Sequence, residues 1–306
     1  MDRLREMEVL VAVVEAGSFV GAASRLGASP PAITRAVASL EGRLGVRLLI
    51  RTTRALRLTD AGQRFVDHTR RLLGEIDAAE RDALGETDEP SGHLTLTASL
   101  TFGRIVLAPV VTAFLAAHPK VTASVRLHDR VVDLLDEGID VAVRIAELPD
   151  SSLVARRVGD VRRLLVAGPG YLAEHGAPDA PAQLKAHAVI AFTGLMPGRE
   201  WRYRADGRTR TVTISPRLEI NDALAALAAA EAGEGITPAL SYMTADAMAA
   251  GRLVPVLEDW APSPAPVHLV HQQGRLVPQK IRAFMDFAAP RLMAALGNLA
   301  NEEPQS

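Results

Sequence analysis

The stretch GASPPAITRAVASLEGRLG, residues 27–45, places a serine and two adjacent prolines ahead of a regular apolar pattern. The first turn of a helix contains backbone N–H groups that have no intrahelical partner, so Pro30 and Pro31 remove no hydrogen bond there. Ser29 is a favourable N-cap for such a helix. The apolar side chains recur at helical spacing, at Ile33, Val37, Leu40 and Leu44. The stretch predicts an amphipathic helix that begins at the prolines.

The opposite face of this predicted helix is small and cationic, with Pro31, Thr34, Arg35, Ala38 and Gly42. The surrounding residues, 25–71, include ten arginines and only three acidic residues, whereas the whole chain of 306 residues has a formal net charge of −2. A solvated arginine-rich surface has the same composition, so charge alone does not decide its role. A basic segment in an otherwise acidic chain is nevertheless typical of a module that binds a polyanion.

The flanking residues complete the pattern of a winged helix-turn-helix. A first helix is predicted from the apolar spacing over residues 4–14, with Gly17 as its C-cap and Ser18 as the N-cap of a short helix over 19–26. VRLLIRTTRALRLT, residues 46–59, predicts a hairpin with hydroxyl and arginine side chains at its tip. A helical bundle with a surface hairpin is the alternative. The agreement of caps, turn, apolar stripe and basic hairpin favours DNA binding.

In such a motif the second helix enters the major groove, and the wing contacts phosphates or the minor groove. The predicted DNA-contacting residues are Ser18, Ser29, Pro30, Pro31, Thr34, Arg35, Ser39, Arg51, Thr52, Thr53 and Arg54. We expect Arg35 and Thr34 to contact base edges or nearby phosphates. Ser29 is expected to cap the helix and also to reach a phosphate.

A long helix is predicted to begin after Thr59, a good N-cap, and to end near Leu84. Its apolar positions alternate steps of four and three, which is the spacing of a heptad seam. This seam predicts dimerisation through Phe65, Leu72, Leu73, Ile76 and Ala79. Packing against the first helix of the same chain is the alternative, and both arrangements fit different parts of the helix. The polar sequence GETDEPSG, residues 85–92, predicts a hinge at a domain boundary.

These features resemble the LysR-type transcriptional regulators. The resemblance is carried by FVGAASRLGASPPAITRAVASLEGRLGVRLLIRTTRALRLTDAG, and further on by VVDLLDEGIDVAVRI, SSLVARR, AGEGI and AGRLVPVLEDW in the family's order. It implies a winged helix-turn-helix DNA-binding domain over 1–58, a linker and dimerisation helix with a hinge over 59–89, and an effector-binding domain over 90–306. That last domain is expected to resemble a periplasmic binding protein, with lobe I at about 90–162 and 266–295 and lobe II at about 163–265.

The same resemblance implies double-stranded promoter DNA and a small-molecule effector as partners. It also implies homodimers that assemble into a tetramer, and contact with RNA polymerase. At one position the chain departs from the family, because Pro30 stands where a polar residue, often Gln, commonly follows the capping serine. Proline offers no side-chain donor, so base reading is expected to rest on Thr34 and Arg35.

From residue 93 onward the chain alternates predicted strands and helices, which predicts an α/β fold. VVDLLDEG, residues 131–138, is predicted as a helix, Pro109 as an early turn or kink in another helix, and Asp206-Gly207 as the turn of a hairpin. Two lobes joined by crossings near residues 162–166 and 262–266 are expected to leave a cleft between them.

Ligands of such sheets bind beyond the carboxyl ends of the strands, near helix N-termini. The predicted effector-binding residues are Ser99, Thr101, Phe102, Ile145, Ala146, Thr193, Asn221, Gly235 and Ile236. Thr101 and Asn221 are each expected to cap a helix as well, and capping alone is the commoner role of such residues. Free helix N-termini with few acidic residues nearby favour an anionic ligand such as a carboxylate.

The chain has no cysteine and no G-x-S-x-G, P-loop or H-E-x-x-H motif, so we predict no enzyme activity, no metal site and no cofactor. His268 and His271 are three apart in a predicted strand and therefore face opposite sides of it. The N-terminal sequence is not a signal peptide and no uncharged span is long enough to cross a bilayer, so we expect a cytoplasmic protein. Two alternatives remain: a solute-binding protein or enzyme with an added N-terminal module, and an architectural nucleoid protein without sequence preference.

Overall fold

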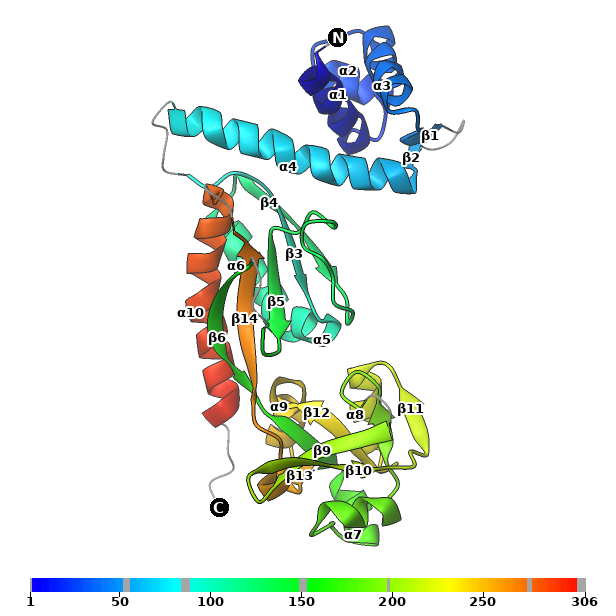
Figure 1. The fold of residues 1–306 in the computed structure, drawn as a ribbon, viewed down its shortest axis with the longest axis vertical. Coiled ribbons are helices and arrows are strands. Elements are labelled where there is room, and N and C mark those ends of the chain that lie inside the picture. Colours follow the sequence, from blue (N-terminus) through cyan, green and yellow to red (C-terminus); the bar gives the residue numbers. More distant parts are fainter. Residues whose placement is uncertain are drawn as a thin grey trace.

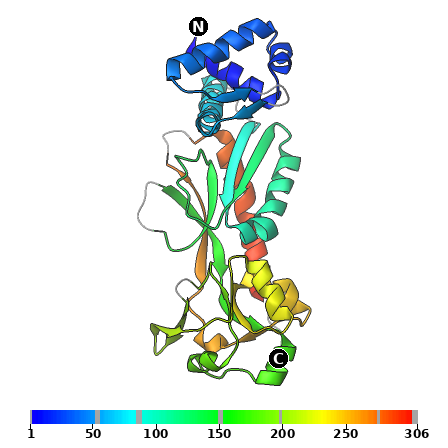
Figure 2. The ribbon, with the colours of Figure 1, turned by 90° about the vertical axis from the view of Figure 1, so that its right-hand side faces the viewer.

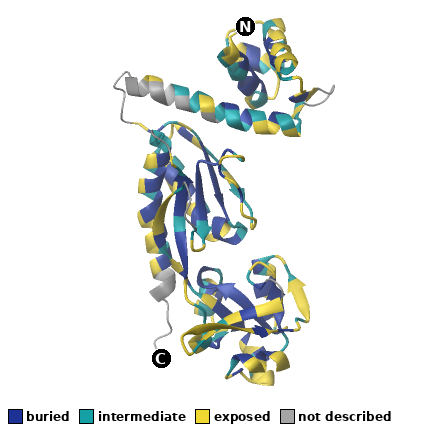
Figure 3. Ribbon diagram, in the orientation of Figure 1, coloured by how far each residue is buried: buried dark blue, intermediate teal, exposed yellow. Residues whose placement is uncertain are grey.

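The computed structural model describes residues 2–51, 56–83, 89–148, 153–196, 199–273 and 277–301. In these residues three parts follow one another along the long axis: a helical N-terminal domain, a long helix, and a two-lobed α/β unit (Figure 1). The view turned by 90° shows the same stacking (Figure 2). Buried residues are found in the N-terminal domain and in each lobe (Figure 3), and the core of lobe I also takes in Leu240 and Tyr242 of lobe II. The multidomain fold class predicted from the sequence is therefore confirmed.

The N-terminal domain is a three-helix motif followed by a short hairpin. Its elements are α1 (Arg3–Glu15), α2 (Phe19–Arg25), α3 (Pro30–Leu44), β1 (Leu49–Arg51) and β2 (Leu56–Leu58). As predicted, Gly17 is left-handed, with a φ of 63°, and the Ser18 hydroxyl accepts a hydrogen bond from the Gly21 N–H at 3.0 Å. Pro30 and Pro31 lie in the first turn of α3, and Gly45 ends that helix in a left-handed conformation. One apolar core, which includes Leu10, Ile33, Val37 and Leu40, joins the three helices.

The linker helix α4 (Asp60–Ala83) begins as predicted, because the Thr59 hydroxyl accepts a hydrogen bond from the Gly62 N–H at 2.9 Å. Val66 is fully buried in the core of the N-terminal domain, and Thr69 is buried as well. Leu72, further along the same seam, is 44% exposed. The first part of α4 therefore packs on its own chain, which was the alternative to dimerisation. The side chain of Ala79 lies outside the described residues.

Lobe I is built on a five-stranded sheet with the order β4-β3-β5-β14-β6. Its strands are β3 (Gly92–Ala98), β4 (Val121–Leu127), β5 (Val141–Ile145), β6 (Leu153–Val161) and β14 (Ala265–Gln272). Two helical elements cover the sheet. The first is a continuous run of α5 (Leu100–Phe102), a π-helical turn (Gly103–Leu107) and α6 (Ala108–Ala117), and the second is the C-terminal helix α10 (Gln279–Asn301). β14 and α10 return the chain to this sheet from lobe II.

The helical run Leu100–Ala117 has the length and hydropathy of a membrane span, but 44% of it is buried inside lobe I. Phe102, Leu107 and Phe114 are among the most deeply buried side chains of the described residues. Phe114 packs edge-on against Phe284 of α10, with ring centroids 5.1 Å apart. This run is therefore the central core helix of lobe I.

Lobe II contains a sheet in which β7 (Arg163–Ala167) pairs with β12 (Ile236–Leu240) on one side and β13 (Val254–Val256) on the other. The parallel pair β8 (Ile190–Phe192) and β11 (Leu218–Ile220) and the hairpin of β9 (Glu200–Ala205) and β10 (Arg208–Thr213) lie beside it. The helices are α7 (Pro169–His175), α8 (Ala223–Glu231) and α9 (Ser241–Ala249), with 3-10 turns at Pro181–Ala186 and Glu258–Trp260. The hairpin turns at Asp206-Gly207, as predicted.

One detail of the effector domain differs from the sequence prediction. Residues 131–138 form turns rather than a helix. The Asp133 carboxylate accepts hydrogen bonds from the Leu135 and Asp136 N–H groups at 2.7 and 3.1 Å, as an N-cap does, but the turn that it starts ends at Gly138, which is left-handed with a φ of 63°. At Pro109, predicted as an early turn or kink, a π-helical turn precedes α6 and the proline lies in the first turn of α6.

The packing of α4 on the wing yields a test that compares two glycines of the same helix. A Cβ atom added at Gly62 would lie 2.0 Å from the Leu48 carbonyl oxygen, whereas one at Gly74 would meet nothing within 4 Å. Gly62→Ala should therefore destabilise the N-terminal domain by about 1–3 kcal/mol, since backbone must move. Gly74→Ala should stabilise α4 slightly, by roughly 0.5–1 kcal/mol. Hydrogen exchange of the α1 and α3 amides measures the first effect and that of the α4 amides the second, and equal effects of the two substitutions would contradict the contact.

Candidate nucleic-acid interface and effector cavity

The predicted recognition face lies on the outside of α3. Pro30, Pro31 and Arg35 are exposed, and Thr34 is half-buried. Among the described residues Arg35 has no carboxylate within ion-pair distance. Ser29 occupies the N-cap position, but its hydroxyl makes no capping hydrogen bond. The prediction that this side chain caps the helix was therefore wrong, and its contact with a phosphate stays a prediction. An unused hydroxyl, a helix N-terminus and an unpaired guanidinium therefore share one surface.

A buried carboxylate fixes α3 against α1. Glu6 is 2% exposed and accepts hydrogen bonds from the Ser39 hydroxyl at 2.6 Å and from the Arg43 guanidinium at 3.0 Å. These two donors, Ser39 foremost, hold the pKa of the Glu6 carboxyl below its ordinary value. Ser39 was predicted to contact DNA. Ser39 is exposed and its hydroxyl donates to Glu6, which helps to position α3; its contact with DNA stays a prediction.

The wing is tied to α3 by another carboxylate. Glu41 accepts hydrogen bonds from the Leu48 and Leu49 N–H groups at 2.7 and 3.0 Å, so the first strand of the hairpin starts from a fixed point. Arg51 is the last residue of β1, and its side chain lies outside the described residues. The predicted DNA contacts Thr52, Thr53 and Arg54 also lie outside them. Ser18 caps α2.

A cavity of about 960 Å³ separates the two lobes. Four of the predicted effector residues line it, namely Ser99, Thr101, Ile145 and Ala146. Lobe II contributes Arg163, Phe192, Gly194, Leu195, Leu240, Tyr242 and Met243. The volume lies in the upper part of the range that small-molecule sites occupy. The segment between β4 and β5, residues 128–135, covers one side of the cavity.

Five predicted effector residues lie outside this lining. Phe102 is fully buried in the core of lobe I, where its ring meets that of Tyr242 edge-on at 5.2 Å. Gly235 has a φ of 145°, and a Cβ there would lie 2.3 Å from the Ala188 carbonyl oxygen, so this glycine serves a close backbone approach. Ile236 is fully buried in the core of lobe II.

The other two of the five belong to the junctions of lobe II. The Thr193 N–H donates to the Ile220 carbonyl at 2.9 Å, and Asn221 is exposed. The predicted capping roles were also misplaced by one or two residues. The N-cap of α8 is Asp222, whose carboxylate accepts from the Ala225 N–H at 2.8 Å, and the N-cap of the run that contains Thr101 is Ser99.

The sequence prediction missed the polar groups that the cavity leaves without a partner. The Tyr242 hydroxyl, the Ser99 hydroxyl and the Gln272 amide nitrogen are buried, and apart from the contact of the two hydroxyls with each other they have no hydrogen-bond partner among the described residues. Burial raises the pKa of the Tyr242 phenol, so this hydroxyl remains a donor at neutral pH. Buried polar atoms are normally hydrogen-bonded, so these three call for a ligand or ordered water. No short motif marks them, because they come from three elements far apart in the sequence.

The sequence led us to expect few acidic residues near the ligand. Asp129, Asp133 and Glu147 nevertheless line the cavity. Two of these carboxylates are already engaged: Asp129 accepts from the Leu100 N–H at 3.0 Å, and Asp133 caps the turn described above. Arg144 and Arg163 also line the cavity, and in the described part of the chain neither has a carboxylate within ion-pair distance. By the same criterion the three carboxylates have no cationic partner among the described residues either, so the lining offers Arg144 and Arg163 to an anion without being cationic as a whole.

In the described residues no group of three or more His, Asp or Glu side chains could hold a metal ion. His271 is buried and its imidazole Nδ1 lies 2.8 Å from the Gln272 carbonyl oxygen.

Comparison with known proteins places this arrangement in a family. Residues 4–63 match the bacterial regulatory helix-turn-helix protein model of the lysR family, and residues 87–293 match the LysR substrate binding domain. An HTH-type transcriptional repressor of Pseudomonas aeruginosa is 36% identical over 94% of this chain and 91% of its own length. The transcriptional regulator CrgA of Neisseria meningitidis serogroup C is 33% identical over 96% of this chain and 97% of its own.

Solved structures agree with these matches. The structure of CrgA, a LysR-type transcriptional regulator from Neisseria meningitidis, superposes with a TM-score of 0.61 at 31% identity and covers 95% of this chain and 99% of its own. The full-length Vibrio cholerae virulence activator AphB gives 0.58 at 28% identity, with 94% and 98% covered. The chain belongs to the LysR family of bacterial transcriptional regulators.

The Glu6 cluster predicts a pH dependence in the N-terminal domain. Because folding lowers the pKa of Glu6, its contribution to stability is complete above the ordinary glutamate value of 4.5 and is lost as the pH falls through the lower folded value. Glu6→Gln should lower the opening free energy of α3 at pH 7 by about 2 kcal/mol, the scale of hydrogen bonds to a charged group. The deficit should shrink at pH 3.

Hydrogen exchange of the α3 amides measures this. Glu8→Gln is the matched control, since Glu8 pairs with the exposed Arg5 on the same helix and should change little. A deficit that stays the same at both pH values would show that Glu6 does not act through its charge.

Proposed function

We propose that this LysR-family protein is a regulator whose promoter binding or activation is modulated by an anionic small molecule bound between its lobes. Two observations support the two halves of this proposal. The exposed face of α3 presents Arg35 without a counter-charge, and the cavity combines unpaired arginines with a buried tyrosine donor. We place DNA binding in residues 1–58, the linker and hinge in 59–89, and effector binding in 90–306.

In the DNA complex Arg35 and Thr34 contact base edges in the major groove or neighbouring phosphates. Ser29 reaches a phosphate, which its unused hydroxyl at the N-terminus of α3 supports. Arg51, Thr52 and Arg54 extend from the wing to the DNA backbone, which the fixed base of the hairpin supports.

The effector is an anion with an apolar body. Arg144 and Arg163 supply charge, while the Tyr242 and Ser99 hydroxyls supply hydrogen bonds to its head group. Leu134, Leu240, Met243 and their neighbours form an apolar wall for the remainder. Because both lobes contribute, binding favours the state in which they close on the ligand, and only by as much as the ligand prefers that state.

The protein acts in the cytoplasm as a homodimer that assembles into a tetramer. Dimerisation uses the part of α4 beyond the N-terminal core, where Leu72 is exposed and Leu73 and Ile76 are half-buried. Effector-driven closure changes the spacing of the paired DNA-binding domains, and with it DNA bending or contact with RNA polymerase. The protein catalyses no reaction.

Arg35 provides the test of sequence reading. Arg35→Ala should weaken binding to the promoter region upstream of the protein's own gene by about 1–3 kcal/mol more than binding to random DNA. Fluorescence anisotropy at fixed salt measures both affinities. Arg3→Ala, which removes the same charge from an exposed position on α1, should weaken both DNAs alike and little. Equal losses on both DNAs for Arg35→Ala would demote Arg35 to a phosphate contact.

The charge of the effector is tested with a pair of isosteric probes. 1-Naphthoate should bind the full-length protein about tenfold more tightly than neutral 1-naphthamide, because only the carboxylate meets an unpaired arginine. Arg163→Gln should remove most of this preference, whereas Arg202→Gln on the exposed β9 strand should keep it. Isothermal titration calorimetry gives the affinities, and a preference for the amide would overturn the anionic proposal.

A further inference from the structure

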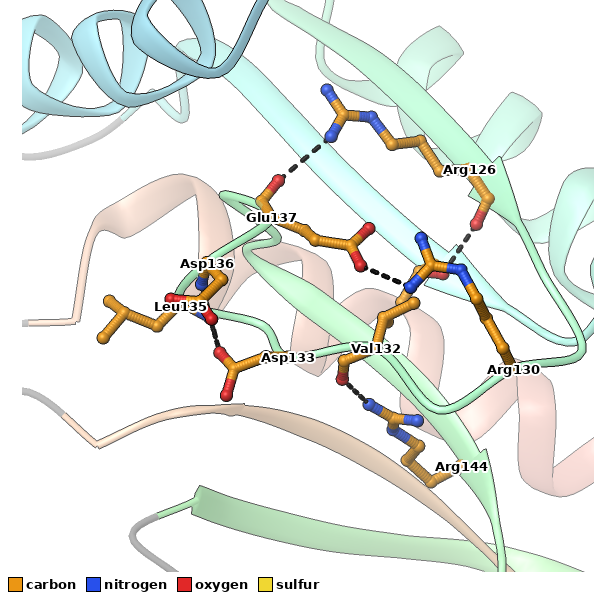
Figure 4. A network of polar contacts seen from close by, with 9 residues as sticks. Arg126, Arg130, Val132, Asp133, Leu135, Asp136, Glu137 and Arg144 are labelled. Atoms are coloured by element: carbon orange, nitrogen blue, oxygen red, sulfur yellow. Dashed lines mark hydrogen bonds and ion pairs between the residues drawn. The ribbon is translucent and has the colours of Figure 1, made fainter. Parts of the chain in front are cut away.

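The segment between β4 and β5 forms one hydrogen-bonded unit next to the cavity (Figure 4). The Arg144 guanidinium donates to the Val132 carbonyl, and the Asp133 carboxylate caps the turn that follows. Arg130 and Glu137 form an ion pair at 2.8 Å across the segment. Val132, Asp133, Arg130 and Arg144 all line the cavity. A ligand that displaces any of these groups therefore acts on the whole segment, here called the cavity loop (residues 128–140).

The far end of the cavity loop reaches the linker helix through Gly138 and through a side chain of β4, that of Arg126. The Arg126 guanidinium donates from one nitrogen to the Glu137 carbonyl at 3.0 Å and from the other to the Asp67 carboxylate of α4 at 2.9 Å. The backbone carbonyl of Arg126 accepts from the hydroxyl of Thr97, a cavity residue, at 2.6 Å. Arg126 is therefore held by cavity elements on two sides and by the linker helix on a third.

The contact is partly shielded from water and is geometrically specific. The Arg126 side chain is 29% exposed and that of Asp67 is 15% exposed, which strengthens the pair relative to one on an open surface. Gly138 of the cavity loop lies directly over Asp67, with a left-handed φ of 63°. Asp67 also accepts hydrogen bonds from Gln63 one turn earlier, so its carboxylate remains oriented toward lobe I.

Movement of Asp67 moves the DNA-binding domain. The neighbouring Val66 is fully buried in the core of that domain, and Thr69 is 1% exposed. The helix and the domain are thus one body at this point, and a small shift at Asp67 becomes a rotation of the recognition helix.

We propose that Arg126 couples occupancy of the cavity to the orientation of the DNA-binding domain, by bridging the cavity loop and the linker helix within one chain. This coupling rests on the proposed effector function of the cavity. Arg126 thereby has a regulatory role without touching DNA. The cavity loop, which the sequence had predicted to be partly helical, becomes the element that senses the ligand.

A distance measurement tests the coupling without knowledge of the effector. The chain has no cysteine, so spin labels at Gly42→Cys on α3 and Ala116→Cys on α6 are site-specific; both positions are exposed. Excess unlabelled chain in the mixture suppresses distances between subunits. In the full-length protein Asp133→Ala, which releases the turn of the cavity loop, should shift or widen the distance distribution by about 2 Å or more.

The decisive comparison repeats Asp133→Ala in an Arg126→Ala background. In that background Asp133→Ala should not change the distance distribution further, because Arg126 no longer connects the cavity loop to the linker helix. Arg156→Ala is the matched control: Arg156 also pairs across lobe I, with Asp286 at 3.0 Å, and should leave the response to Asp133→Ala intact. Arg126→Lys keeps the charge, and since one ammonium cannot reproduce the two-pronged bridge it should behave like Arg126→Ala.

Two outcomes overturn the coupling: an equal response to Asp133→Ala with and without Arg126, or no response in the otherwise unaltered protein. If Arg126→Ala unfolds the chain, the lysine variant and Asp67→Asn give the same cycle. Failure of the proposed function is distinguishable, because absence of any protected promoter site in a footprint would reject DNA regulation while leaving the distance cycle unaffected.

Discussion

The close contact between Gly62 and the backbone of Leu48 is the constraint on which the architecture depends. Because no side chain separates the two segments, the first turn of α4 lies directly on the wing, and Val66 continues the same packing into the helical core. The linker is therefore a rigid extension of the DNA-binding domain and not a tether. Its opposite face is then free to meet lobe I through Asp67, so the direction of a single helix relates the recognition surface to the effector domain.

Elements that depend on local chemistry were predictable from the sequence. The start of α3 follows from two prolines and an apolar stripe, the ends of α1 and α2 from Gly17 and Ser18, and the start of α4 from Thr59. Each signal acts within a few residues, so no knowledge of the fold is needed. The cavity is different, because Tyr242 and Ser99 come from separate lobes and their hydroxyls are brought together only when the lobes meet. Four of nine predicted effector residues reach the lining, since the ends of strands mark an edge of a sheet and not a cavity wall.

The failed prediction at the cavity loop has a physical cause that matters for function. Residues 131–138 carry helical apolar spacing, but Asp133 satisfies the backbone locally, and Arg126 and Arg144 bind carbonyl oxygens of the segment from outside it. A helix over 131–138 would commit the Val132 carbonyl to its own ladder and leave Arg144 without this acceptor. Departures from local sequence preference are expected where a protein places function. Here the departure lies between the cavity and the linker helix.

The recognition helix shows how structural and functional demands divide one short stretch. Glu6 occupies Ser39 and Arg43, so the C-terminal half of α3 is devoted to holding the helix in place. The N-terminal half is open, because Ser29 leaves its hydroxyl unused and the prolines carry no N–H. Proline at position 30 also offers no side-chain donor next to the cap. The geometry at this end suits a phosphate, and under the proposed function base reading falls to the next turn, where Arg35 is the one long donor without a partner on the described part of that face.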